Sequence, residues 1–259
     1  HRSGELTPVY VPDQDDEAIR DLVRARADTQ KALRKVKQQI NAFLLRHGIS
    51  YHGKTKWSKI HLTWLTAIKM AHPAQQIALT EYLDAMENNE ARVIRITKQL
   101  ESFCHSWRLR PVVQALQSMR GISFVSAVTI IAELGDLNRF DKPTQLMAYL
   151  GLIPSEYSTG NSIKKGPITK TGNTHARRAL IESAQAYRLP ARKSVAIRKR
   201  QQGVSEDVLS VSWDAQLRLC SRYRSLKAKG KHHNVVITAI ARELAGFIWA
   251  IVRLVPIAA

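Results

Sequence analysis

Two long runs of helical periodicity constrain this chain more than any other feature of its sequence. Over residues 13–46 the apolar side chains recur every three or four residues, and Gly48 follows as a stop. A second run covers residues 77–103, after Pro73. Clean alternation of apolar and polar residues, which indicates β-strands, is almost absent. The sequence therefore predicts an all-α fold with at most a short hairpin in residues 151–173.

The two runs are separated by a shorter segment near residues 57–65. They indicate an antiparallel helical hairpin or a dimerising coiled coil, and the equal alternative is that both apolar stripes face a core in the same chain. After Arg110–Pro111 the pattern changes to short helices and tight turns. We predict a linker and long-helix region over residues 1–110 and a compact helical domain, containing a helix-hairpin-helix, over residues 111–259.

The charge of the chain is strongly unbalanced. Lys and Arg number 40 against 21 Asp and Glu, which gives a formal net charge of +19. This excess predicts attraction to polyanions. Nucleic acid is the first partner to expect, and an anionic membrane surface is the competing one. A silent, solvated basic surface is the remaining explanation.

The last apolar pattern, residues 234–253, tests the membrane interpretation. Arg242 and Glu243 interrupt it, so its longest apolar run is shorter than the roughly 20 residues that span a bilayer. We predict a buried core helix and no membrane partner. Cys104 and Cys220 form no metal pattern and no disulfide framework, and no signal peptide is recognisable. We therefore expect a cytoplasmic protein.

The segment SMRGISFVSAV, residues 118–128, has the pattern of a helix-hairpin-helix. One helix ends at Gly121, a short turn follows, and a new helix starts at Ser123. Backbone amides at such a turn, together with the dipole of the second helix, bind phosphate. An ordinary turn capped by Ser123 explains the same residues.

Residues 151–173 form a long polar connection between two apolar helical patterns. A nucleophilic hydroxyl on a loop surrounded by cations is what attack on a phosphodiester requires, because the cations stabilise the charge that develops on the phosphoryl oxygens. Serines in glycine-rich loops are more often simple turn residues. The connection contains the hydroxyls of Ser155, Ser158 and Thr159 and the cations Lys164, Lys165 and Lys170.

Asn173 is a suitable N-cap for the helix that follows this connection. The helix carries His175, Arg177 and Arg178 in its first turns, where cations oppose the helix dipole. We infer an external anion at this helix start. His175 and Glu156 are candidates to assist a nucleophile, although His175 fits a solvated position equally well.

A further basic run, residues 188–200, contains Arg192 and Lys193 and is predicted to contact nucleic-acid backbone. Paired catalytic carboxylates are not evident. Glu133 and Asp136 are spaced for one helix face, but Asp136 more simply ends that helix. The sequence predicts no metal ligands.

Residues 120–184 resemble the C-terminal transposase domain of a bacterial insertion-sequence family of the DEDD type. The resemblance rests on the hairpin, AELGD, the AYLGL-P-E-S-G pattern and the I-K-GN-R-L pattern, in the family's order. Residues 2–12 are similar to the segment that joins the family's two domains, so the resemblance covers nearly the whole chain. Family members are described as bridge-RNA-guided serine recombinases.

The resemblance implies that Ser158 is the nucleophilic serine, with Thr159 and Ser155 as weaker candidates. It also implies DNA and a guide RNA as partners, and a homo-oligomer that is a dimer or a tetramer. The family's four carboxylates bind Mg²⁺ on a separate N-terminal domain that is similar to Holliday-junction resolvases.

One departure from the family concerns those carboxylates. The acidic cluster after residue 12, formed by Asp13, Asp15, Asp16 and Glu17, does not match them and is typical of a helix N-terminus. We therefore expect no cofactor in this chain, and no complete recombination by this polypeptide alone. The alternative function is a non-catalytic, helical nucleic-acid-binding protein.

Overall fold

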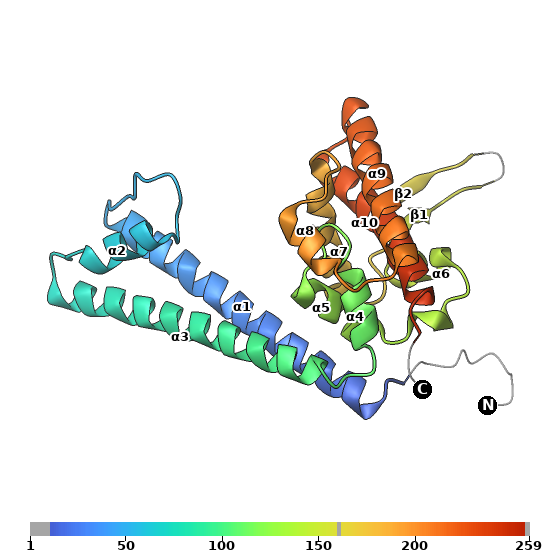
Figure 1. Cartoon of the computed structure of the whole chain (residues 1–259). Coiled ribbons are helices and arrows are strands. Elements are labelled where there is room, and N and C mark those ends of the chain that lie inside the picture. Colours follow the sequence, from blue (N-terminus) through green and yellow to red (C-terminus); the bar gives the residue numbers. More distant parts are fainter. Residues whose placement is uncertain (1–10, 160–161, 257–259) are drawn as a thin grey trace, which may run out of the picture. The chain divides into compact units, whose positions relative to one another are not determined.

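The structure is a computed structural model that describes residues 11–159 and 162–256 (Figure 1). It confirms the predicted all-α class, with two short strands in the described part of the chain. The helices are α1 (Gln14–Arg46), α2 (Lys59–Ala67), α3 (Pro73–Cys104), α4 (Arg110–Leu116), α5 (Phe124–Leu134), η1 (Leu137–Arg139), α6 (Pro143–Tyr149), α7 (Thr174–Ala184), η2 (Gln185–Arg188), α8 (Val195–Arg200), α9 (Glu206–Ala228) and α10 (His233–Arg253). The strands are β1 (Pro154–Glu156) and β2 (Lys165–Ile168).

The chain divides into two compact units, and the division differs from the predicted boundary at residues 110 and 111. Unit 1 comprises residues 1–20 and 102–259, and unit 2 comprises residues 21–101. The first turns of α1 and the end of α3 thus belong with the C-terminal part of the chain. Most of the predicted linker, residues 2–12, lies outside the described residues.

Unit 2 is the predicted antiparallel hairpin of long helices. Arg26 donates to Thr97 over 2.7 Å, Lys37 lies 4.0 Å from Glu90, and the rings of Phe43 and Tyr82 pack at 5.7 Å. Residues nearer the end of α1 contact residues nearer the start of α3, so the two helices run in opposite directions. Both apolar stripes contribute residues to one core within the chain. That core contains Leu33, Ile40, Phe43, Leu44, Leu65, Leu79, Met86 and Val93.

Unit 1 is built around α10, which packs against α9, α7, α6 and α4 (Figure 1). By length and composition α10 could cross a membrane. Its apolar face, however, is buried inside the unit, from Val236 to Val252. This confirms the predicted core helix. α5 packs between α4 and α7 and contributes a second buried face, which includes Ile130 and Ile131.

A buried carboxylate ties the start of α1 to the loop before α4. Asp16 is fully buried and accepts a hydrogen bond from the indole N–H of Trp107 over 2.7 Å. It also pairs with the guanidinium of Arg108, which extends to Asp13 over 2.7 Å. Burial raises the pKa of Asp13, but hydrogen bonds from the Asp16 amide and from Arg108 more than offset this, so its pKa lies below the ordinary value. The predicted acidic helix start is confirmed, with the added role of an anchor.

We predict that Asp16→Ala lowers the free energy of unfolding by about 3 kcal/mol, because it leaves a buried indole N–H without its acceptor and removes one of the two carboxylates that Arg108 contacts. Asp15→Ala is the matched control, since Asp15 is an exposed acid in the same helical turn. Denaturant unfolding followed by circular dichroism measures both. Equal losses for the two variants would contradict the anchoring role.

Candidate functional site

The polar connection of residues 151–170 is an antiparallel hairpin arm. β1 and β2 pair with Pro154 opposite Ile168 and Glu156 opposite Lys165, with a register irregularity between these pairs. Backbone hydrogen bonds continue in both directions, from Lys170 N–H to the Gly151 carbonyl at the base and between Thr159 and Ser162 near the tip. The short hairpin allowed by the sequence is confirmed, and it projects from unit 1 (Figure 1).

Two glycines lock the base of this arm onto the end of α6. Gly151 and Gly172 have φ values of 61° and 71°, a region that side chains with a Cβ rarely adopt. A Cβ at Gly172 would overlap the carbonyl oxygen of Tyr149, and one at Gly151 would overlap the backbone of Thr171. The glycines therefore allow close contact within the chain at the base of the arm.

Ser158 lies just after β1, on the side of the arm that comes first in the chain, and is half-buried. Its hydroxyl donates to the Glu156 carboxylate over 2.8 Å and accepts from the backbone N–H of Lys164 over 3.2 Å. In an extended chain, residues two apart lie on the same face, which explains why Glu156 reaches this hydroxyl. The pair has the geometry of a nucleophile beside a general base.

The predicted cations of the arm are all exposed. Lys164 and Lys165 lie on the strand opposite Ser158, and Lys170 lies at the base with a φ of 58°. Ser155 has a structural contact, since its hydroxyl donates to the Pro167 carbonyl over 3.0 Å. Thr159 is exposed and pairs through its backbone with Ser162. Of the three candidate hydroxyls, that of Ser158 contacts a carboxylate.

Arg177 does not face solvent as the predicted nucleic-acid contact would. Its side chain is buried, with 9% of the residue exposed. The guanidinium donates to the carbonyl of Leu150 over 3.0 Å and to that of Thr171 over 2.7 Å. These donors hold the two ends of the arm at the start of α7, so we assign Arg177 a structural role and remove it from the nucleic-acid surface.

The start of α7 combines capping with exposed cations. Asn173 is the predicted N-cap, and its side-chain oxygen accepts from the Ala176 amide over 2.9 Å. Its amide group donates to the buried Glu133 carboxylate over 2.6 Å, which fixes α7 against the end of α5. His175 and Arg178 are exposed, and Arg178 pairs with Glu182 over 2.8 Å.

The turn at Gly121 and Ser123 joins α4 to α5, although α4 ends at Leu116 rather than at Gly121. Gly121 has the expected positive φ of 82°, but its close neighbour is the Ser183 carbonyl at the end of α7. Ser123 is the residue before α5, with its hydroxyl directed at Ser126 over 3.3 Å. The arm joins the other end of α7, and a rise of 1.5 Å per residue separates the two ends of this helix by about 16 Å. The structure therefore does not bring this turn together with Ser158.

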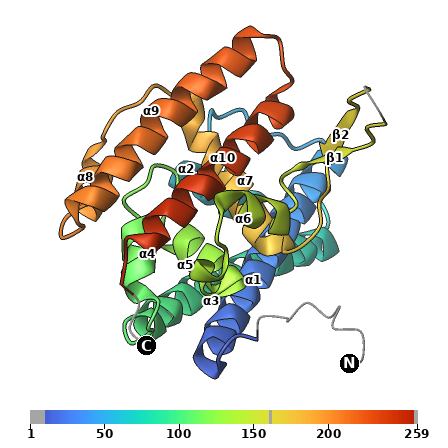
Figure 2. The same cartoon turned by 90° about the vertical axis from the view of Figure 1, so that its right-hand side faces the viewer.

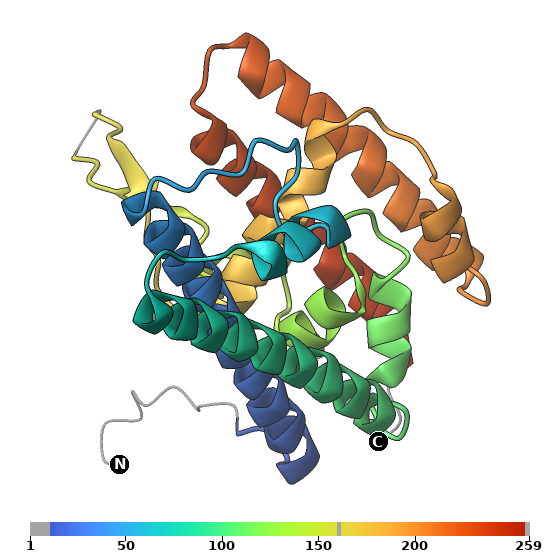
Figure 3. The same ribbon diagram turned by 90° about the vertical axis from the view of Figure 1, so that its left-hand side faces the viewer.

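Arg192 and Lys193 form a separate basic region before α8. Both are exposed, and the Lys193 ammonium lies 5.2 Å from the centre of the Trp213 ring. Figures 2 and 3 show α8 and the hairpin arm on opposite sides of unit 1. These two residues therefore belong to a different part of the surface from Ser158.

The carboxylates of this chain do not gather into a metal site in the described ranges. Within residues 11–159 and 162–256, no group of three or more His, Cys, Asp or Glu side chains is placed to hold a metal ion. Asp136 caps η1 by accepting from the Asn138 amide over 2.9 Å, as the predicted end of the helix requires. Glu133 contacts Asn173.

Comparison with known proteins shows which family this part of the chain is similar to. Residues 113–199, which include the turn, the arm and α7, match the model of the Transposase IS116/IS110/IS902 family. This part of the chain is therefore similar to transposases of that family. The matched range ends within α8 and includes the whole arm.

The similarity to relatives extends beyond the residues that match the family model. A protein of Sinorhizobium fredii named "Putative transposase y4qE" is 47% identical over 97% of this chain and 61% of its own length. The transposase for insertion sequence element IS1533 of Leptospira borgpetersenii is 28% identical over 85% of this chain and 64% of its own length. The chain thus spans less than two thirds of these two relatives.

We predict that Gly172→Ala lowers the free energy of unfolding by about 3 kcal/mol, from strain at positive φ and overlap with the Tyr149 carbonyl. Gly203→Ala is the matched control, because Gly203 has a φ of 76° with nothing within 4 Å of a built Cβ. The control should lose only about 1 kcal/mol. Denaturant unfolding compares the two, and similar losses would show that the base of the arm is not tightly packed.

Proposed function

We propose that this chain acts in the transposition of an insertion element, and that Ser158 is the nucleophile that attacks the DNA backbone. The observation that carries the proposal is the Ser158 hydroxyl, hydrogen-bonded over 2.8 Å to Glu156 on an arm within the residues that match the family model. In the proposed step the Ser158 oxygen bonds to phosphorus, the bond from phosphorus to a deoxyribose oxygen breaks, and the hydroxyl proton passes to Glu156.

The charges of the arm support this step. Lys165 is exposed at the start of β2, opposite Glu156, and Lys164 is the exposed residue before it. Cations placed there stabilise negative charge on the phosphoryl oxygens as the new bond forms. They also attract the DNA backbone without selecting a sequence.

We propose that the complete recombination system contains further components. The family resemblance implies Mg²⁺ on an acidic domain, a guide RNA and a dimeric or tetrameric assembly, and the sequence itself predicts a cytoplasmic location. We propose that this chain acts with such an acidic domain and does not complete recombination without it. The proposed roles of Ser158 and Glu156 do not involve the metal ion.

The alternative is a non-catalytic nucleic-acid-binding protein, and the structure of the arm favours it in one respect. The Ser158 hydroxyl accepts from the Lys164 amide and so also stabilises the turn of the hairpin. In that case Ser158 would only shape the arm, and the lysines would bind backbone.

Ser158→Ala separates the two functions. The chain is combined with the acidic domain of a relative, incubated with labelled DNA that carries an end of the element, and digested with nuclease. Mass spectrometry should then find a nucleotide linked through phosphate to the peptide that contains Ser158. We expect Ser158→Ala to abolish this adduct and to leave DNA binding nearly unchanged, because the cations remain.

Ser162→Ala is the matched control, since Ser162 is an exposed serine on the same arm. It should keep the adduct. An adduct that persists in Ser158→Ala and disappears in Thr159→Ala would move the nucleophile to Thr159. Absence of any adduct, with DNA binding intact, would support the non-catalytic function.

The lysines of the arm allow a separate prediction. The double variant Lys164→Gln and Lys165→Gln should reduce the slope of log affinity against log salt by about 0.9 for each lost phosphate contact on duplex DNA. Lys98→Gln is the control, because Lys98 is exposed on α3 and belongs to neither predicted nucleic-acid-binding region. Fluorescence anisotropy over a salt series measures the slopes. An unchanged slope in the double variant would place the DNA elsewhere.

A further inference from the structure

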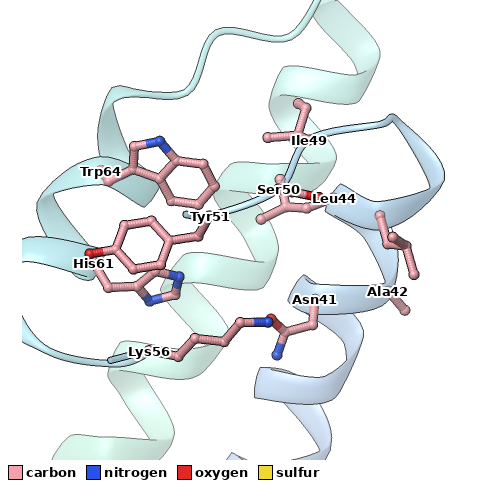
Figure 4. Close-up of a pocket in the computed structure, with 10 residues that line it drawn as sticks. Asn41, Ala42, Leu44, Ile49, Ser50, Tyr51, Lys56, His61 and Trp64 are labelled. Atoms are coloured by element: carbon pink, nitrogen blue, oxygen red, sulfur yellow. The ribbon is translucent and has the colours of Figure 1, made fainter. Parts of the chain in front are cut away.

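A pocket in unit 2 lies where the end of α1, the following loop and α2 meet. Its volume is about 290 Å³. Figure 4 shows the rings of Tyr51, His61 and Trp64 together on one side, with Lys56 reaching across to Asn41. We call these five residues the aromatic pocket. It lies wholly within residues 41–64 and shares no residue with the hairpin arm.

The rings of the aromatic pocket are held in place by one another. The centre of the Tyr51 ring lies 4.4 Å from that of His61 and 5.0 Å from that of Trp64. His61 is buried, and its Nδ1 accepts from the backbone N–H of Trp57 over 3.0 Å. Burial, together with the nearby charge of Lys56, lowers the pKa of His61, so the ring is neutral near pH 7 and carries its proton on Nε2.

The pocket lies in the longest stretch of the chain without an acidic residue. Between Asp28 and Glu81 there is no Asp or Glu, whereas nine residues are Lys or Arg. Lys54, Lys56 and Lys59 are exposed in the loop and at the start of α2. The Lys56 ammonium donates to Asn41 over 3.0 Å, which leaves donors for a second partner.

We propose that the aromatic pocket binds one unstacked base of a single-stranded nucleic acid, while the lysines around it pair with the flanking phosphates. Aromatic platforms beside a cationic surface are the arrangement by which proteins hold single strands, since every base has a π-face. The volume lies at the low end of the range for small-molecule sites, about 300–1,000 Å³, which suits one base and excludes a stacked duplex.

Charge and ring chemistry together favour this ligand over other polyanions. An acidic peptide would use the lysines and leave the rings without a planar partner. A nucleic-acid strand uses both. The contact is independent of the proposed reaction, because it lies in the other unit and makes no use of Ser158.

The test measures binding of short fluorescent oligonucleotides to the full chain by anisotropy. Trp64→Ala should weaken binding of single-stranded oligo(U) or oligo(dT) by about tenfold, within the range for loss of one base–aromatic stack. Trp64→Phe should restore most of the affinity, because it keeps a π-face. Circular dichroism establishes that each variant retains its helices.

An abasic strand of the same length is the decisive ligand. It keeps every phosphate and has no base to stack, so Trp64→Ala should not change its affinity. Lys56→Gln should instead weaken both strands and lower the salt slope by about 0.7, the value for one phosphate contact on a single strand. Lys31→Gln, an exposed lysine of α1 outside the pocket, is the matched charge control.

The outcomes distinguish the proposal from a purely structural cluster. An equal loss for Trp64→Ala on strands with and without bases, or on duplex DNA, would overturn the proposal, because the effect would then not depend on an unstacked base. Tighter binding of oligo(U) than of its deoxyuridine counterpart would identify RNA as the source of the base. Equal or weaker binding would identify DNA.

Discussion

The guanidinium of Arg177 is the contact on which the arrangement of the polar arm depends. It donates to carbonyls at both ends of the arm, at Leu150 and at Thr171, and it is itself buried at the start of α7. Gly151 and Gly172 let the backbone close around this point. A long connection rich in Gly, Ser and Lys would otherwise lose much conformational entropy on adopting one shape.

This role of Arg177 also shows where sequence reasoning stops. The helical period places Arg177 on the same face as Leu180 and Ala184, and Arg178 on the face of Glu182. It does not reveal that the guanidinium of Arg177 meets the carbonyls of Leu150 and Thr171. The helices themselves were predictable, because α1 and α3 follow long apolar stripes and end near Gly48 and Phe103. Arg242 and Glu243 interrupt the apolar pattern of α10, so it was predictable that α10 is a buried core helix and not a membrane span. Neither inference required contacts between distant residues.

Long-range contacts account for what the sequence did not reveal. Asp16 looks like its neighbours in an acidic helix start, yet it alone of that cluster is fully buried, because Trp107 and Arg108 approach it from residues far along the chain. The division between the units follows from the same contacts. By contrast, the proximity of Glu156 to Ser158 follows from the period of an extended chain, so the hairpin prediction alone places them on one face. The aromatic pocket combines residues of α1, a loop and α2, and only the fold assembles it.

The distribution of charge gives the two units different relations to nucleic acid. In unit 1 the Ser158 hydroxyl contacts a carboxylate on an arm with exposed lysines, and we propose that this arrangement serves reaction with a backbone phosphate. In unit 2 lysines lie near aromatic rings, and no acid lies between Asp28 and Glu81; we propose that this arrangement holds a strand through its bases. A net charge of +19 could by itself serve any polyanion. The neighbours of those cations distinguish the two proposals: a hydroxyl beside a carboxylate in one unit, and aromatic rings in the other.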